Sequence, residues 1–145
     1  MNIVPFSTEY SAGIRSFVIG VLEDEGFAYD PLKDLDLDDI EGNYLRAGGA
    51  FFVSVHNGEV VGTSAVRSLG SDTCEIKRLY VKRECRGKGL GLALFQKALD
   101  FAEQNFSSIR LKTDSSLEKA ISIYLRHGFA VAKEEGGTVY FERSV

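Results

Sequence analysis

Three glycines at alternate positions lie in a short basic stretch, Arg86-Gly87-Lys88-Gly89-Leu90-Gly91. Glycine lets a backbone come close to a ligand, because no Cβ stands in the way. The stretch opens a helical pattern, and the first N–H groups of a helix attract an anion. Together with the charge of Arg83, Arg86 and Lys88, this favours a pyrophosphate site. A glycine-rich helix start with solvated basic residues stays the alternative, since glycine spacing alone is a weak signal.

The spacing excludes two other phosphate-binding loops. A Walker loop needs four residues between its first glycine and Gly-Lys-Ser/Thr, and the chain has no such segment. A dinucleotide fingerprint needs Gly-x-Gly-x-x-Gly in the first β-α-β unit, with an acidic residue about 20 positions later. The glycines at 87, 89 and 91 do not have that spacing.

The elements that position this loop follow from hydrophobic periodicity and turn signals. Apolar residues from Tyr10 to Leu22 recur at helical spacing, and a second helix is predicted from about Leu35 to Ala47, ended by Gly48-Gly49. The pair Asn57-Gly58 predicts a tight hairpin. Further helices are predicted at 89–105 and 116–126, and strands at 1–6, 50–56, 60–68, 75–81, 109–113, 129–132 and 138–141. The order predicts one α/β (α+β) domain over residues 1–145, with a mixed sheet and helices on both faces.

Three segments in this order resemble the GNAT (GCN5-related N-acetyltransferase) superfamily. Arg86-x-x-Gly89-x-Gly91 is similar to the family motif Gln/Arg-x-x-Gly-x-Gly/Ala, and the strand Ile76–Val81 is similar to the family's signature strand. The segment from Ala120 through Tyr124 to Gly128-Phe129 is similar to Ala-x-x-x-Tyr-x-x-x-Gly-Phe. The resemblance implies a mostly antiparallel sheet of about seven strands flanked by about four helices.

The resemblance also implies acetyl-CoA as cofactor and assigns residues to it. The loop amides would bind the pyrophosphate, and the strand end would bind the pantetheine arm through its backbone. The implied cofactor residues are Leu79, Tyr80, Val81, Arg86, Gly87, Lys88, Gly89, Leu90, Gly91, Ser116, Ala120 and Tyr124. Family members often carry Asn where this chain has Leu117, and Asp114, Ser115 or Ser116 is available in its place.

Two residues are candidates for proton transfer. Glu75 stands where several family members place a glutamate that deprotonates the amine, directly or through water, and burial would raise its pKa. Its alternative is an ion pair with Lys77 on the same strand face. Tyr124 matches the family tyrosine whose hydroxyl meets the coenzyme A sulfur, although its helical spacing also suits a core aromatic. No Ser-His-Asp or Cys-His arrangement is evident, which favours direct attack by the amine over an acyl-enzyme.

The sequence gives only weak evidence for the identity of the acceptor amine. Phe27 and Tyr29 lie in the loop after the first helix, where the fold usually admits the acceptor, and each is equally a core or surface residue. Arg67 and Arg78 suit a substrate carboxylate, or pair with the chain's own acids. A small or amino-acid-like amine is expected, with a protein amine or a non-catalytic acyl-CoA-binding module as alternatives.

Composition and charge limit the classes of protein to which the chain could belong. A net charge of −4 argues against general nucleic-acid binding. No apolar run approaches the roughly 20 residues that span a bilayer, and the N-terminus lacks the layout of a signal peptide. Cys74 and Cys85 have no metal-ligand spacing, so no metal is expected and free thiols of a cytoplasmic protein are predicted. Nothing decides between a monomer and a homodimer.

Overall fold

A computed structural model describes residues 2–27, 30 and 34–145. It contains one seven-stranded sheet in the order β1-β2-β3-β4-β5-β7-β6, in which β4 and β5 are parallel and every other pair is antiparallel. The strands are β1 (Asn2–Pro5), β2 (Ala50–His56), β3 (Glu59–Gly70), β4 (Thr73–Val81), β5 (Ser108–Asp114), β6 (Ala130–Glu135) and β7 (Thr138–Ser144). The predicted mixed, mostly antiparallel sheet is confirmed.

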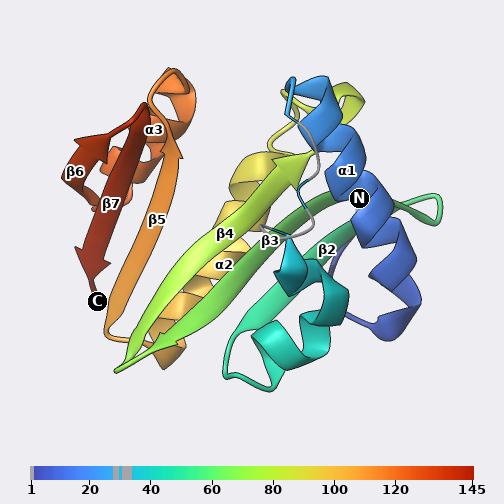
Figure 1. The fold of residues 1–145 in the computed structure, drawn as a ribbon, viewed down its shortest axis with the longest axis horizontal. Coiled ribbons are helices and arrows are strands. Elements are labelled where there is room, and N and C mark those ends of the chain that lie inside the picture. The colour runs from blue at the N-terminus through green and yellow to red at the C-terminus, as the bar shows by residue number, and fades with distance from the viewer. Residues whose placement is uncertain (1, 28–29, 31–33) are drawn as a thin grey trace.

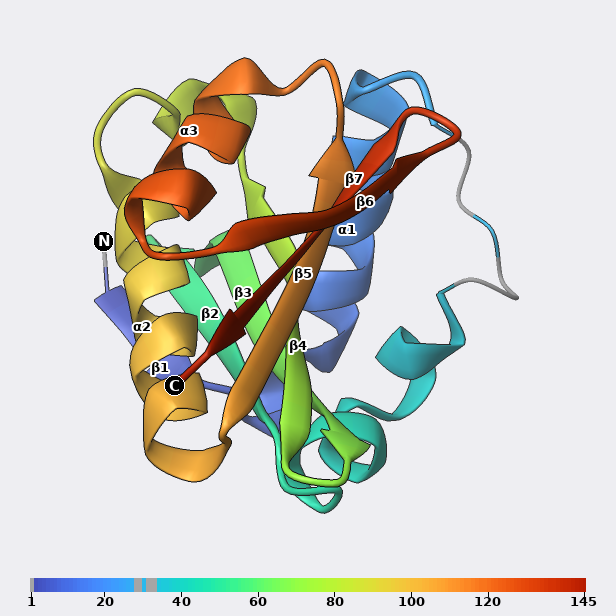
Figure 2. The same cartoon turned by 90° about the vertical axis from the view of Figure 1, so that its left-hand side faces the viewer.

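Helices cover both faces of this sheet. Figure 2 shows α1 (Ser11–Asp24) on one side and α2 (Leu90–Asn105) with α3 (Glu118–Arg126) on the other. Helix α2 buries its apolar stripe, including Leu94, Phe95 and Ala98, because residues three and four apart share one helix face. Within the described residues, no helix is long and apolar enough to cross a membrane.

The second predicted helix is present in a different form. Its segment folds as a 3-10 turn, η2 (Leu35–Asp39), followed by a π-turn, η3 (Glu41–Leu45). This winding buries Asp36 and lets the Tyr44 hydroxyl donate a hydrogen bond to its carboxylate. Two irregular turns therefore replace a regular helix and provide hydrogen-bond partners for the buried Asp36 carboxylate, since an unpaired buried carboxylate is costly.

Strands β4 and β5 are paired at one end only. Their register covers Thr73↔Ser108, Cys74↔Ile109 and Glu75↔Arg110 and then stops. Figure 1 shows the two strands meeting near the start of β4 and spreading apart toward its end. The sheet is thus split by a V-shaped opening, and the backbone of β4 beyond Lys77 has no β5 partner on that side.

A β-bulge lies in β4 beside this opening. The register with β3 shifts between Thr63↔Tyr80 and Ala65↔Lys77, and Arg78 has a φ of 56°, in the left-handed region that non-glycine residues rarely adopt. The Thr63 hydroxyl donates a hydrogen bond to the Arg78 carbonyl at 2.7 Å. A bulge re-aims side chains, and here Lys77 and Arg78 both lie on the α1 side of the sheet.

Candidate active site

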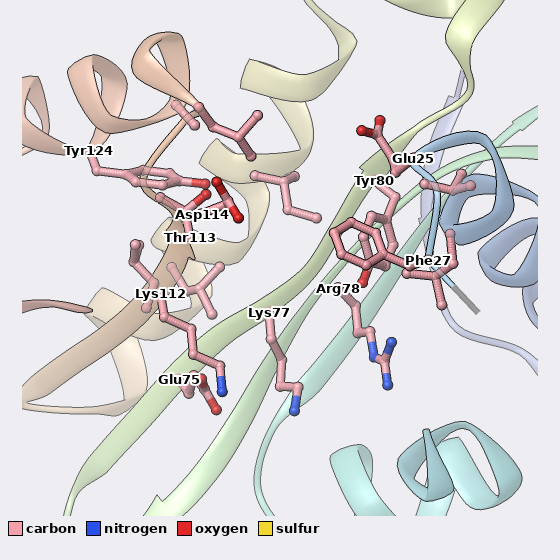
Figure 3. A pocket seen from close by; sticks show the side chains of 17 residues that line it. Glu25, Phe27, Glu75, Lys77, Arg78, Tyr80, Lys112, Thr113, Asp114 and Tyr124 are labelled. Carbon is pink, nitrogen blue, oxygen red and sulfur yellow. The ribbon is translucent and has the colours of Figure 1, made fainter. Parts of the chain in front are cut away.

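A cleft of about 540 Å³ fills the opening between β4 and β5. One wall is residues 75–80 of β4 and the other is residues 111–114 of β5. Helix α3 adds Leu117, Ala120 and Tyr124, and α1 with the residues after it adds Val21, Leu22, Glu25 and Phe27. Figure 3 shows these side chains converging from both walls. The cleft therefore brings together segments that are far apart in the sequence.

The basic glycine loop begins where β4 ends, at the wide end of the opening (Figure 1). Gly87 and Gly89 have φ values of 78° and 83°, which favour glycine, and Gly89 is the N-cap of α2. The Ala93 N–H donates to the Gly89 carbonyl at 3.0 Å, so the three N–H groups before it lie in the unpaired first turn of the helix. The loop thus has the backbone form of an anion site.

Arg86 is held in place rather than left free at this loop. Its Nε donates to the Val81 carbonyl at 3.0 Å, and a terminal guanidinium nitrogen lies 3.0 Å from the Glu25 carboxylate. Because Glu25 also lines the cleft, this ion pair ties the loop to the end of α1. Lys88 is exposed and, in the part of the chain that the structure describes, is in no ion pair. Lys88 is therefore the loop cation that is available to an anion.

Tyr124 lies between the core and the cleft. It is 8% exposed, and its ring packs against Phe95, Phe129 and Phe141. Figure 3 shows its hydroxyl pointing into the cleft. Burial raises the pKa of Tyr124, so the phenol stays protonated and is a hydrogen-bond donor. The ring is therefore a core aromatic, while the hydroxyl end faces the cleft, and its contact with the coenzyme A sulfur stays a prediction.

Glu75 lies at the closed end of the opening, away from Tyr124 (Figure 3). It is half-buried rather than buried. Four residues of strand separate it from Leu79, which is about 13 Å in an extended chain. Proton transfer between an amine near Leu79 and Glu75 would therefore pass through water.

The other predicted cofactor residues divide into two groups. Leu79, Tyr80 and Ala120 line the cleft, whereas Val81, Ser116 and the loop residues 86–91, among them the buried Leu90, are outside its lining. Ser116 is occupied locally: its N–H and hydroxyl both bond to the Asp114 carboxylate, at 2.9 and 2.6 Å. These hydrogen bonds lower the pKa of Asp114. Leu117, at the family's Asn position, is the N-cap of α3 and makes no side-chain capping bond.

The predicted acceptor residues have different surroundings. Phe27 lines the cleft and is 59% exposed, while Tyr29 lies outside the described residues. Arg78 reaches the cleft but binds Asp34 and Asp36, each at 2.7 Å, and is 9% exposed. The alternative that Arg78 pairs with the chain's own acids is thus what the structure contains. Arg67 lies 6.0 Å from the centre of the Tyr44 ring, outside the cleft lining.

Sequence reasoning missed Lys77 and Lys112 as site residues, although both line the cleft. Burial lowers the pKa of Lys77, and the carboxylates of Glu75 and Asp36 partly offset that effect. The signal available in the sequence was alternation: Glu75 and Lys77 share a strand face, as do Arg110 and Lys112. The sequence does not reveal the strand register that places these side chains of β4 and β5 next to each other.

Comparisons with known proteins agree with this geometry. Residues 18–129 match the Acetyltransferase (GNAT) family. The chain is 34% identical over 114 residues to the uncharacterized N-acetyltransferase YjgM of Escherichia coli, a match covering 76% of this chain and 66% of that protein. It is 39% identical over 97 residues to human N-acetylaspartate synthetase, covering 65% of this chain and 32% of that protein.

Solved structures share the fold at low identity. A GNAT-family acetyltransferase from Staphylococcus aureus superposes with a TM-score of 0.85 at 24% identity, covering 99% of this chain and 98% of the other. The PaiA N-acetyltransferase of Thermoplasma acidophilum, solved with coenzyme A, has a TM-score of 0.76 at 17% identity and complete coverage of both chains, 100% each. With the split sheet, the bulged strand and the glycine loop in place, the chain belongs to the Acetyltransferase (GNAT) family.

Proposed function

We propose that the protein transfers an acetyl group from acetyl-CoA to the primary amine of a small, amino-acid-like acceptor, by direct attack of the amine. The observation that carries the proposal is the cleft between β4 and β5, which extends from Glu75 at its closed end to Tyr80 near the end of β4, after which the glycine loop follows. Such a cleft accommodates an extended cofactor with an anionic end, and leaves the closed end for a second substrate.

The loop and strand residues suit coenzyme A. An added Cβ at Gly87 or Gly89 would meet no atom within 4 Å, so these glycines serve the backbone conformation that presents N–H groups to an anion. Beyond the bulge, β4 has backbone groups free on the β5 side, where a pantetheine amide would hydrogen-bond. In the same family fold, the Thermoplasma protein has been solved in complex with coenzyme A.

The chain's own residues supply three functions in the transfer. When bound, acetyl-CoA supplies an activated thioester. A backbone N–H between Leu79 and Val81 stabilises charge that develops on the carbonyl oxygen. Tyr124 donates a proton toward the departing sulfur, and Glu75 accepts the amine proton through water. The similarity to the N-acetylaspartate synthetases of zebrafish, frog, rat and human supports an amino-acid acceptor.

The test is a transfer assay with a panel of primary amines. Purified protein is incubated with acetyl-CoA and each amine, and both free coenzyme A thiol and the acetylated product mass are measured. Transfer to at least one small amine, lost in a Glu75→Gln variant, is the expected result. Binding of acetyl-CoA without transfer to any amine would favour a non-catalytic acyl-CoA-binding module. Transfer to peptide N-termini alone would favour a protein acetyltransferase.

A further inference from the structure

Four cationic side chains share one face of the sheet around Glu75. Arg67 of β3 lies opposite Glu75 in the antiparallel register, and Arg110 of β5 lies beside it in the parallel register. Residues in direct register point to the same face. Lys77 and Lys112 follow two positions later on β4 and β5, so alternation puts them on that face as well. We call Arg67, Lys77, Arg110 and Lys112 the basic platform.

The basic platform is unpaired. Within residues 2–27, 30 and 34–145, no carboxylate oxygen lies within the 4.0 Å of an ion pair from any of its four cations. Other cations in the same region of the protein do have such partners: Arg78 with Asp34 and Asp36, and Lys133 with Glu135. In a chain of net charge −4, a cluster of four cations without ion pairs is available to an external anion.

The platform is also accessible from the cleft. A second hollow, of about 320 Å³, adjoins the cleft and shares Glu75, Leu111 and Lys112 with it. Arg110 lines this hollow together with Glu142, which faces Arg110 from β7. The acids beside the four cations are therefore Glu75, Glu142 and Asp36, whose charge acts on Lys77. Figure 3 shows the side chains of Glu75, Lys77 and Lys112 gathered at this end of the cleft.

We propose that the acceptor is a small amine that carries two carboxylates, and that the basic platform binds those carboxylates while the amine points along the cleft toward Leu79. This inference rests on the proposed acetyl transfer and names its substrate class. Two carboxylates complement a set of four cations that outnumbers the acids beside it. A half-buried ammonium such as Lys77 gains most from an anionic partner, because burial disfavours its charge when it is alone.

The platform favours a small acceptor over an acidic peptide. Lys112 lines both hollows, Lys77 lines the first and Arg110 lines the second, while Arg67 flanks Glu75 outside both linings. The four cations are thus gathered around Glu75. In a free amino dicarboxylate, both carboxylates lie within a few bonds of the amine. This short spacing is similar to that of the cations around Glu75, where Lys77 lies two positions along β4 and Arg67 lies opposite on β3. Arg78, which carries two carboxylate partners already, is not part of this recognition.

Calorimetry separates this inference from the proposed function. Coenzyme A is first titrated into the protein; L-aspartate and L-asparagine are then titrated into the coenzyme A complex. We expect aspartate to bind at least tenfold more tightly than asparagine, with affinity falling as salt rises. Lys77→Gln and Arg67→Gln should each weaken aspartate binding about tenfold or more, since each removes a charge-assisted hydrogen bond. Both variants should retain the coenzyme A affinity.

Lys97→Gln is the matched control, because Lys97 is exposed on α2, on the other side of the sheet. Failure of coenzyme A to bind would overturn the proposed function. Normal coenzyme A binding with equal or no binding of aspartate and asparagine would overturn the acceptor inference alone. So would variants that behave like Lys97→Gln, or tighter binding of an acidic peptide such as Asp-Glu-Ala than of free aspartate.

Discussion

The two ends of the cleft are built in different ways. Beyond the wide end lies a continuous segment, Arg86–Gly91, whose backbone conformation and helix start form the proposed anion site. The closed end depends on strand pairing, because Glu75 lines the cleft there while Arg67 of β3 and Arg110 of β5 flank it in register. The first kind of site depends on local backbone form, and the second on the pairing of distant strands. Substitutions should therefore affect the two ends through different quantities.

The largest effect is expected at the wide end. In Gly89→Trp, a side chain is placed at a φ of 83° and over the N–H groups of the helix start, so acetyl-CoA binding should be lost. A ligand that binds the native state at 100 times its Kd stabilises it by about 2.7 kcal/mol, and this thermal stabilisation should disappear. The matched control is Gly136→Trp in the β6–β7 turn, with a φ of 59° and open space for a Cβ. Retained stabilisation in Gly89→Trp would contradict the loop assignment.

At the closed end, Glu75→Gln should lower kcat by roughly 10²- to 10⁴-fold, the range for loss of a general base. Acetyl-CoA binding should be unchanged, because Glu75 lies near the start of β4 whereas the loop follows the end of that strand. Steady-state release of coenzyme A thiol measures the first quantity and calorimetry the second. Glu59→Gln, on the exposed β2–β3 hairpin, is the charge-matched control. An unchanged kcat in Glu75→Gln would contradict the general-base role and leave Glu75 only a role in the charge balance of the basic platform.

Between the two ends, the buried network at the bulge should control stability. Asp36→Asn leaves the Arg78 guanidinium short of a partner and should cost about 3–5 kcal/mol. For a chain of this size, this corresponds to a fall in Tm of roughly 10 °C. Asp38→Asn on the same turn is the control, since the Asp38–Arg15 pair is exposed and worth at most about 1 kcal/mol. Equal losses in the two variants would contradict the account.

The same network predicts a pH dependence. Burial alone would raise the pKa of Asp36, but hydrogen bonds from Arg78 and Tyr44 outweigh it and hold the pKa below the ordinary 3.8. Because the folded-state pKa is the lower one, the stabilisation is complete above the unfolded value and is lost as pH falls through the folded pKa. Between about pH 5 and pH 3, the Tm of the wild type should fall more steeply than that of Asp36→Asn.

The smallest effect is expected for Tyr124→Phe. A thiol with a pKa of about 8.5 is a good leaving group without help, so kcat should fall only about tenfold. Stability should change little, because Phe keeps the ring contacts with Phe95 and Phe141. Kinetics and thermal melting are measured together, with Tyr10→Phe as a tyrosine outside the cleft. A large loss of stability with unchanged kcat would make Tyr124 a core residue only.

The glycine loop could be located in the sequence because its determinants are local, and its role as a pyrophosphate site stays a prediction. Glycine spacing, basic residues and the start of α2 all lie within a few positions of one another, and the order of the elements followed from hairpin and helix patterns. The bulge at Arg78 was not predictable in this way: a positive φ usually calls for glycine, and an arginine at that position gives no signal.

The closed end and the η2–η3 segment depended on contacts that no local pattern contains. The periodicity of residues 35–47 favours a regular helix, but Asp36 binds an arginine that is 42 positions away. Arg67, Glu75 and Arg110 come together only through the register of β3, β4 and β5. Hydrophobic alternation predicts the face of each side chain, and the register that aligns the strands comes from the whole sheet.

The most direct test of the account is a calorimetric titration of acetyl-CoA into the wild-type protein. The account predicts saturable binding of one acetyl-CoA per chain, weakened by added salt because phosphate contacts at the loop contribute to it. A folded protein that gives no binding heat at any temperature, and no thermal stabilisation with acetyl-CoA, would contradict the claim that this cleft is an acetyl-CoA site.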